Sequence, residues 1–229
     1  YSKKKYPLVV TVHDLIHEIY HKDFGKKNDF RPKEKILDIA DHIICVSQNT
    51  KKDLIKFYKV DIKKISVIYL GTEISNKKKN NKKNYILFVG SRQRYKNFIN
   101  FVKAYGRSNF LKKNYNILCF GGGNFTNDEI KLFKDMNIIG KVNFREGNDL
   151  ELNRAYLKAS LFVSTSTSEG FGLTLFEAMS HGCPVVCSNI EVFRENLKNC
   201  TQFVDPKKID NIRFGIEKVL RNKLIQKRL

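Results

Sequence analysis

Two glutamates on either side of a glycine-rich turn are the residues of this chain best suited to hold a ligand. Glu169 lies in the loop after the apolar run 160–165, and Glu177 lies further on, in a segment whose apolar residues have helical spacing. A helix that begins after such a loop presents backbone N–H groups at the positive end of its dipole, where phosphate binds readily. A carboxylate inside that helix can accept hydrogen bonds from the vicinal hydroxyls of a ribose. The pattern therefore favours a sugar nucleotide over free phosphate.

The residues around this turn predict the elements that must position the two carboxylates. The run 160–165 is short, apolar and β-branched, as expected of a strand that is buried on both faces. A helix is expected from Leu173, and Gly182 followed by Pro184 ends it, because that order of residues stops helices. A second apolar strand, 184–187, comes next.

Each glutamate also has a simpler explanation. Glu169 could be a favourable charge near the start of the helix, and Glu177 could be a solvated surface residue. For one glutamate alone this explanation is preferred. The two glutamates together, spaced with Gly170, Gly172 and Gly182, favour a binding role.

The stretch SEGFGLTLFEAMSHGCPVV (168–186) resembles the signature of glycosyltransferase family 4, retaining enzymes with the GT-B architecture. Thr174 stands where most members have proline, which should loosen the turn slightly without abolishing the site. The resemblance implies that Glu169 holds hydroxyls of the transferred sugar and Glu177 those of the ribose. It also implies donor-binding roles for the residues between them, with the amides of the last three facing the distal phosphate: Gly170, Phe171, Gly172, Leu173 and Thr174.

A basic loop follows the expected strand 85–89. It carries Arg92, Arg94 and Lys96 after Gly90. Cations at this place can stabilise a diphosphate leaving group instead of a metal ion, although a solvated basic loop is an equal alternative in a lysine-rich chain. The resemblance favours Arg92 and Lys96 as catalytic residues and Gly90 as a binding residue, and it leaves Arg94 open as an alternative to Arg92. No metal is expected.

Two more strand ends carry candidate binding residues. Gly121 and Gly122 follow the expected strand 116–120, and they would let a nucleotide approach the backbone closely. Arg145 and Glu146 follow the expected strand 141–144 and resemble the strand end that receives the nucleotide base. A tight turn and an ordinary charged loop are the respective alternatives.

His13 follows the expected strand 6–12, where side chains at the end of a parallel strand face the ligand crevice. A capping or core histidine is the alternative, and the resemblance implies a catalytic role in orienting sugar and acceptor. Residues 17–21, HEIYH, also fit the letters of a zinc-protease pattern. That pattern needs a continuous helix and a third ligand, whereas Gly25 follows closely and no third ligand is evident, so we do not expect zinc.

Strands and helices alternate in the second part of the chain, which predicts a mostly parallel sheet with helices on both faces. The resemblance implies an α/β, GT-B-like fold. We expect a partial acceptor-side lobe at 1–73, a linker of lysine and asparagine at 74–84, and a complete nucleotide-sugar-binding domain of the Rossmann type at 85–229. Because family members have further strands before such a lobe, we expect either a truncated piece or a protein that needs a partner.

The composition is that of a globular protein: 229 residues, of which 41% are hydrophobic. The net charge of +20 comes mainly from lysine scattered beside asparagine, which compositional drift explains. Attraction to an anionic membrane surface is a secondary expectation, and nucleic-acid binding is a less favoured alternative. No apolar run approaches the roughly 20 residues of a membrane span, and no signal peptide is evident. We expect a cytoplasmic protein, compatible with the inner face of the membrane, whose five cysteines are mostly reduced core thiols.

The resemblance implies a retaining transferase that moves a sugar from a nucleotide-sugar donor to a glycan or lipid-linked acceptor in polysaccharide biosynthesis. The loop after Gly90 makes mannose the first guess for the sugar, with a GDP- or UDP-sugar as donor substrate and no separate cofactor. The alternative is a nucleotide-sugar-binding module that is inactive without a missing lobe or partner.

Overall fold

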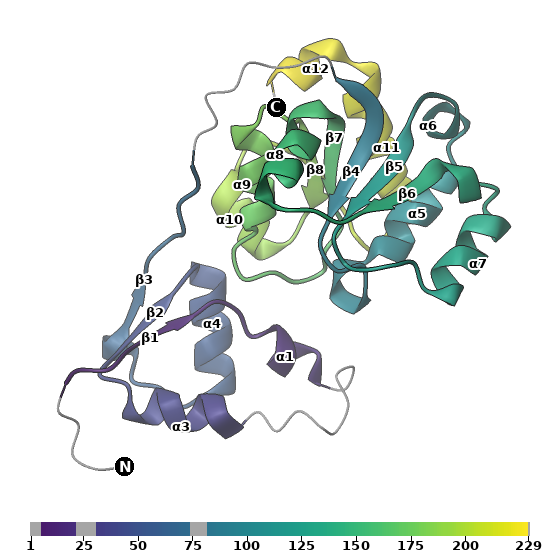
Figure 1. Cartoon of the computed structure of the whole chain (residues 1–229). Coiled ribbons are helices and arrows are strands. Elements are labelled where there is room, and N and C mark those ends of the chain that lie inside the picture. Colours follow the sequence, from purple (N-terminus) through teal and green to yellow (C-terminus); the bar gives the residue numbers. More distant parts are fainter. Residues whose placement is uncertain (1–5, 22–30, 74–81, 229) are drawn as a thin grey trace. The chain divides into compact units, whose positions relative to one another are not determined.

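The computed structural model describes residues 6–21, 31–73 and 82–228, which form two compact units (Figure 1). The first unit is Tyr1–Gly71 together with the short segment Ser168–Gly172, and the second is Thr72–Thr167 with Leu173–Leu229. Most of the predicted linker, residues 74–81, lies outside the described residues. Its last two residues, Lys83 and Asn84, already belong to the first strand of the second unit.

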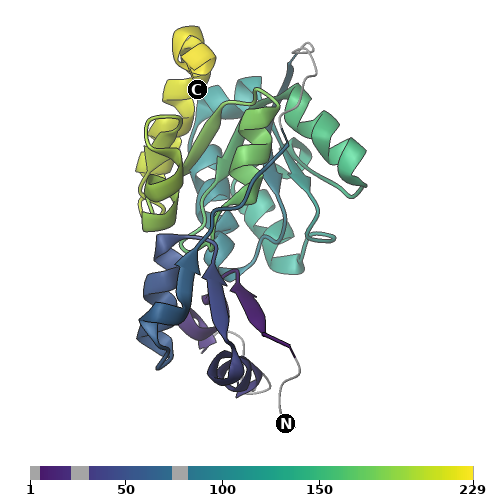
Figure 2. The same cartoon turned by 90° about the vertical axis from the view of Figure 1, so that its left-hand side faces the viewer.

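The first unit is built on a three-stranded parallel sheet with the order β1-β2-β3 (Figure 2). Helix α4 (Gln48–Phe57) is capped by Ser47, whose hydroxyl accepts a hydrogen bond from Thr50 N, as an N-cap serine should. Leu54 of α4 and Leu37 of α3 pack with strand residue Ile43 in one apolar cluster. The described elements are β1 (Val9–Val12), α1 (Ile16–Ile19), α3 (Arg31–Ile39), β2 (His42–Cys45), α4 (Gln48–Phe57) and β3 (Ile65–Val67).

The second unit is built on a six-stranded parallel sheet with the order β6-β5-β4-β7-β8-β9. Its strands are β4 (Lys83–Val89), β5 (Asn116–Phe120), β6 (Val142–Arg145), β7 (Ala159–Ser164), β8 (Val185–Ser188) and β9 (Gln202–Val204). Its helices are α5 (Phe98–Gly106), α6 (Asn109–Asn114), α7 (Asn127–Asp135), α8 (Asp149–Lys158), α9 (Leu173–Ser180), α10 (Glu191–Leu197), α11 (Ile209–Arg221) and α12 (Lys223–Arg228).

Helices cover both faces of this sheet, as predicted (Figure 1). Because side chains alternate along a strand, Ile86 and Phe88 of β4 point to one face and Leu87 to the other. The first face packs against α5, α6, α7 and α11, and the second packs against α8, α9 and α10. None of the helices in the described part of the chain has the length and apolar composition of a membrane span.

Four of the five cysteines are buried. Burial raises the pKa of Cys45 to about 11, and it raises the pKa values of Cys119, Cys183 and Cys187 to about 12. Cys200 is exposed. Since the thiolate is the reactive form, a raised pKa and burial both suppress reaction of the four buried thiols at neutral pH.

Titration of the native chain with a thiol reagent at pH 8 should therefore modify Cys200 and leave the other four thiols unreacted until denaturant is added. The number of labelled thiols is measured by absorbance or mass spectrometry. A Cys200→Ser variant is the control and should show no fast reaction. Fast labelling of a second thiol in the native protein would contradict the buried arrangement.

Candidate functional site

The site candidates of the second unit gather where the order of its strands reverses. The chain runs from β4 outward to β5 and β6 and then returns to place β7 on the other side of β4. In open parallel sheets, ligands bind at the carboxyl ends of the strands beside such a switch point. Gly90 follows β4, Gly121 follows β5, and Arg145 ends β6, so the sequence-predicted strand ends share this edge.

The loop after β4 is fastened to the end of β7, across the switch point. Thr167 N donates a hydrogen bond to Tyr95 O at 2.7 Å, and Asn97 Nδ2 donates to Thr165 O at 3.1 Å. Asn97 has a positive φ of 55°, which asparagine tolerates better than most residues. These bonds fix the backbone on both sides of Lys96, whose side chain is half-buried.

Arg92 does not extend from this loop as a solvent-facing cation. Its side chain is 2% exposed and its Nε donates to Glu129 Oε1 at 2.8 Å. The sequence left the choice between Arg92 and Arg94 open. Arg94 is exposed and Lys96 is half-buried, so these two cations of the loop are the accessible ones.

The glycines at the strand ends let the loop after β4 and the loop after β5 approach each other closely. Gly121 N donates to Arg145 O at 2.9 Å, and Gly90 N donates to Phe120 O at 2.8 Å. Gly121 and Gly122 have φ values of 76° and 82°, in the left-handed region that favours glycine. A Cβ on Gly122 would lie 2.5 Å from Gly90 O, so only glycine fits there.

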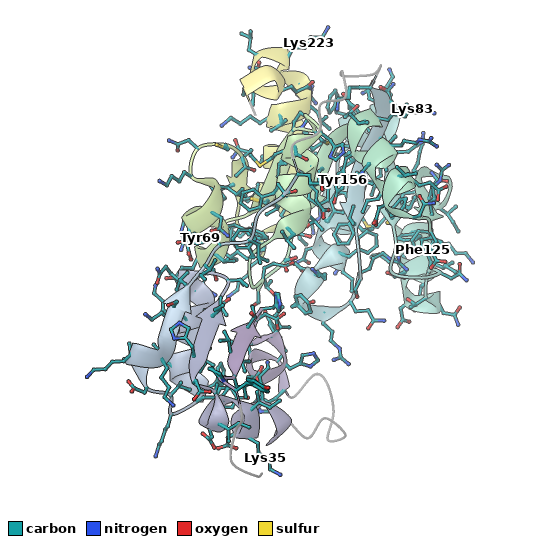
Figure 3. The ribbon with its side chains drawn as sticks, turned by 60° about the vertical axis from the view of Figure 1, so that its left-hand side comes forward. Lys35, Tyr69, Lys83, Phe125, Tyr156 and Lys223 are labelled. Atoms are coloured by element: carbon teal, nitrogen blue, oxygen red, sulfur yellow. The ribbon has the colours of Figure 1, made fainter. Side chains whose placement is uncertain are left out.

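Arg145 and Glu146 are exposed at the end of β6. Arg145 also lines a groove of about 700 Å³ that runs between the sheet and α8. Basic residues predominate among the charged residues of this groove, and its acid Glu151 accepts a hydrogen bond from Asn148 N at 3.0 Å. The bases are Lys83 (marked in Figure 3), Arg145, Arg154 and Lys158. The side chain of Arg145 therefore lies beside a basic groove.

Glu177 is held in place by a buried tyrosine. Tyr156 of α8 (labelled in Figure 3) donates from its hydroxyl to Glu177 Oε2 at 2.9 Å. Burial and the neighbouring Glu177 raise the pKa of Tyr156, so the phenol stays protonated and remains a donor. The ring of Tyr156 stacks on His181, with the centroids 5.8 Å apart. One oxygen of Glu177 is thus positioned by Tyr156, a residue that no motif in the sequence marks.

Segment 168–172, which carries Glu169, belongs to the first unit. The hydroxyls of Ser47 and Thr50 lie 2.8 Å and 3.1 Å from Gly170 O, and both are buried at the start of α4. The ring of Phe171 is buried and lies 6.2 Å from that of Tyr69. The hydroxyl of Ser47, the N-cap of α4, therefore also anchors this segment.

Gly170 also brings this segment against His13. A Cβ on Gly170 would overlap the carbonyl oxygen of His13, so only glycine allows the two backbones to approach so closely. The side chain of His13 is exposed and that of Glu169 is half-buried. The structure thus places the two sequence-predicted residues His13 and Glu169 on adjoining stretches of backbone in the first unit.

The zinc-like pattern at 17–21 has a structural explanation. Glu18 is buried, and it accepts a hydrogen bond from Tyr58 Oη at 2.7 Å and pairs with Lys33 Nζ at 3.0 Å. Helix α1 ends at Ile19, before the second histidine of the pattern. Among the described residues there is no group of three or more His, Cys, Asp or Glu that could hold a metal ion.

Replacing Gly170 by alanine should destabilise the first unit, because the new methyl group overlaps His13 O and the segment 168–172 must shift. We expect the free energy of unfolding to fall by about 1–3 kcal/mol, as in other overpacked sites. Denaturant unfolding followed by circular dichroism measures it. Gly71→Ala is the matched control, since nothing lies within 4 Å of a Cβ there. Equal stability of the two variants would contradict the close approach.

Two protein families cover the chain. The family "Glycosyl transferases group 1" matches residues 71–229, and the family "Glycosyltransferase Family 4" matches residues 1–76. The former match covers well over half of the chain, and it includes the strand ends, Glu169 and Glu177 described above.

Among curated proteins, the chain is 35% identical over 201 residues to the O-antigen chain mannosyltransferase RfbU of Salmonella typhimurium, covering 86% of this chain and 56% of that protein. It is 28% identical over 156 residues to N-acetylgalactosamine-N,N'-diacetylbacillosaminyl-diphospho-undecaprenol 4-alpha-N-acetylgalactosaminyltransferase of Campylobacter jejuni, covering 66% of this chain and 42% of that protein. The chain therefore spans about half the length of these relatives.

Among solved structures, Anabaena Alr3699/HepE in complex with UDP and glucose matches 98% of this chain and 64% of its own, with a TM-score of 0.79 and 16% identity. This likeness shows that the two chains share a fold. Together with the family matches and the RfbU-like sequence, it identifies the chain as a member of the group 1 glycosyl transferases, with the GT-B fold of glycosyltransferase family 4.

Proposed function

We propose that the protein to which this chain belongs transfers a sugar from a nucleotide-sugar donor to a glycan or lipid-linked acceptor, with retention at the anomeric carbon. The observation that carries the proposal is the fixed carboxylate of Glu177 in a unit whose strand ends meet at a switch point. A carboxylate held by a neutral buried phenol keeps one oxygen oriented while the other can accept hydrogen bonds from a ribose.

In this proposal the second unit binds the nucleotide. Glu177 takes the ribose hydroxyls, and the amides at the start of α9, Leu173 and Thr174, take the distal phosphate. The amide of Gly172, the last residue of segment 168–172, is assigned to the same phosphate. Lys96 neutralises charge on the leaving diphosphate, which makes a metal ion unnecessary. The glycine turn after β5 and the end of β6 at Arg145 and Glu146 are assigned to the base.

The sugar is assigned to residues of the first unit. Glu169 would hold sugar hydroxyls, and His13 would orient the sugar and the acceptor. Support comes from the close approach of Gly170 to His13 and from the anchoring of Gly170 O by Ser47 and Thr50, because these contacts restrict where the neighbouring Glu169 can go.

For the donor sugar we propose mannose, carried by GDP or UDP. Support for mannose is the likeness to a protein named as an O-antigen chain mannosyltransferase, and support for UDP is the likeness to a structure solved with UDP and glucose. A lipid-linked acceptor is suggested by the relative whose name contains diphospho-undecaprenol. We therefore propose a role in polysaccharide biosynthesis at the cytoplasmic side of a membrane.

A donor-binding module without activity is the second candidate, because the chain covers 56% of its mannosyltransferase relative. Thermal unfolding of the chain with a panel of UDP-, GDP- and ADP-sugars identifies the donor, since a ligand that binds only the native state raises the melting temperature. Incubation with the radiolabelled donor then separates the candidates. Transfer or hydrolysis that Glu169→Gln abolishes supports the enzyme, and saturable binding without turnover supports the module. No shift with any donor would reject both.

Tyr156→Phe should weaken donor binding, because it removes the hydrogen bond that orients Glu177. Since a hydrogen bond to a charged group contributes about 1.5–3 kcal/mol, we expect the dissociation constant to rise at least tenfold. Isothermal titration measures it. Tyr105→Phe is the matched control: it also removes a buried phenol bond, from Tyr105 Oη to Tyr115 O at 2.6 Å, but on the opposite face of the sheet. Both variants should lose stability, and only Tyr156→Phe should lose affinity.

A further inference from the structure

We propose that Arg92 is a positioning residue that, together with Glu129, holds the turn 121–124 in the form that binds the donor nucleotide, and that it does not itself contact the donor phosphates. The proposal rests on the proposed nucleotide-sugar binding and deepens it. It reverses the role that the resemblance implied for Arg92, and it leaves Arg94 and Lys96 as the cations that meet the diphosphate.

The guanidinium of Arg92 is fully engaged with the turn after β5. Nη1 donates to Gly121 O at 3.2 Å, and Nη2 donates to Gly123 O and Asn124 O, both at 2.9 Å. Nε donates to Glu129 Oε1 at 2.8 Å. The planar fork of arginine thus gathers three carbonyl oxygens and a carboxylate, which a lysine with its single nitrogen cannot do.

Three aromatic rings enclose the same guanidinium. Its central carbon lies 4.8 Å from the ring centroid of Phe125, 5.7 Å from that of Phe144 and 5.9 Å from that of Phe98. These rings come from Phe125, directly after the turn, from β6 and from α5 (Phe125 is labelled in Figure 3). Moving Arg92 outward to a phosphate would break these cation–π contacts together with its hydrogen bonds, which makes such a movement costly.

Glu129 joins the arginine to the start of α7. Its Oε2 accepts a hydrogen bond from Thr126 N at 2.8 Å and completes a capping box, while Oε1 accepts from Arg92. The side chains of Arg92 and Glu129 are 2% and 11% exposed. Removing either partner would leave the other charge poorly solvated, so the two residues act as a unit.

The turn that Arg92 holds has its amides directed away from the arginine. Gly121, Gly122 and Gly123 all have positive φ, and the chain has no cis peptide bond among its described residues. In a trans peptide the N–H points opposite to the preceding C=O. With the carbonyls of 121, 123 and 124 directed at Arg92, the N–H groups of 122, 124 and 125 face the other way. These N–H groups are donors for polar groups of the base or ribose, the part of the nucleotide that the proposed function assigns to this turn.

The test compares a nucleoside diphosphate with its nucleoside, using guanosine and GDP or uridine and UDP according to the donor identified. A residue that contacts phosphate contributes only to binding of the diphosphate, whereas a residue that shapes the turn contributes to both ligands. We expect Arg92→Lys and Glu129→Gln each to raise the two dissociation constants by the same factor, about tenfold. Lys96→Ala should raise the constant for the diphosphate and leave that for the nucleoside unchanged.

Hydrogen exchange of the free protein, followed by mass spectrometry, gives a readout that does not need a ligand. Arg92→Lys and Glu129→Gln should speed exchange in residues 121–126 and in the first turn of α7. Arg107→Lys is the control, because Arg107 forms an exposed ion pair with Asp210. Arg92→Met, which removes the charge altogether, is a more severe variant. If it fails to fold, Arg92→Lys and Glu129→Gln still carry the test.

The outcomes separate this inference from the proposed function. If no nucleotide binds the unmodified chain, the proposed function fails. The role of the turn in donor binding then fails as well, even if hydrogen exchange is faster in the Arg92→Lys and Glu129→Gln variants. If nucleotides bind, loss of diphosphate affinity alone in the Arg92 and Glu129 variants, or unchanged exchange at 121–126, overturns the positioning role. Equal losses for nucleoside and diphosphate together with faster local exchange support it.

Discussion

The pairing of β4 with both β5 and β7 is the constraint on which the candidate site depends. All three strands are parallel, so their carboxyl ends lie at one edge, and the chain reverses its direction of sheet growth between β4 and β7. The loop after β4 and the loop after β7 leave this edge on opposite sides of the switch point. The bonds from Asn97 to Thr165 and from Thr167 to Tyr95 fix the distance between these two loops. The switch point is therefore framed by backbone that is already rigid before a ligand arrives.

The regular elements of the second unit were predictable because apolar runs bounded by turn formers mark them. Strand β5 has the predicted bounds, Asn116–Phe120. Strand β4 begins earlier than predicted, at Lys83, because pairing with Ala159 uses the backbone and needs no apolar side chain. Helix α6, Asn109–Asn114, was not predicted, since it is too short to show helical periodicity; its cap Ser108 was the available signal.

The positions of the site candidates were predictable only as far as local motifs reach. The motif located Glu169 and Glu177, and the strand ends located the glycine turns. The partners of these residues could not be predicted, because they are distant in sequence: 21 residues separate Tyr156 from Glu177, and 123 separate Ser47 from Gly170. Spacing within a loop likewise does not decide which cation becomes buried. That choice depends on rings that three separate elements supply around Arg92.

The double use of Glu129 has a consequence for how this family can diverge. The carboxylate of Glu129 both caps the start of α7 and pairs with Arg92. A substitution at position 129 alone therefore removes the cap and leaves Arg92 without its counter-charge. Positions 92 and 129 should therefore be inherited as a pair, and lineages that abandon the arginine should also abandon the acid and the rings at 98, 125 and 144. In such lineages other contacts must hold the three glycines, 121 to 123, in their positive-φ conformation.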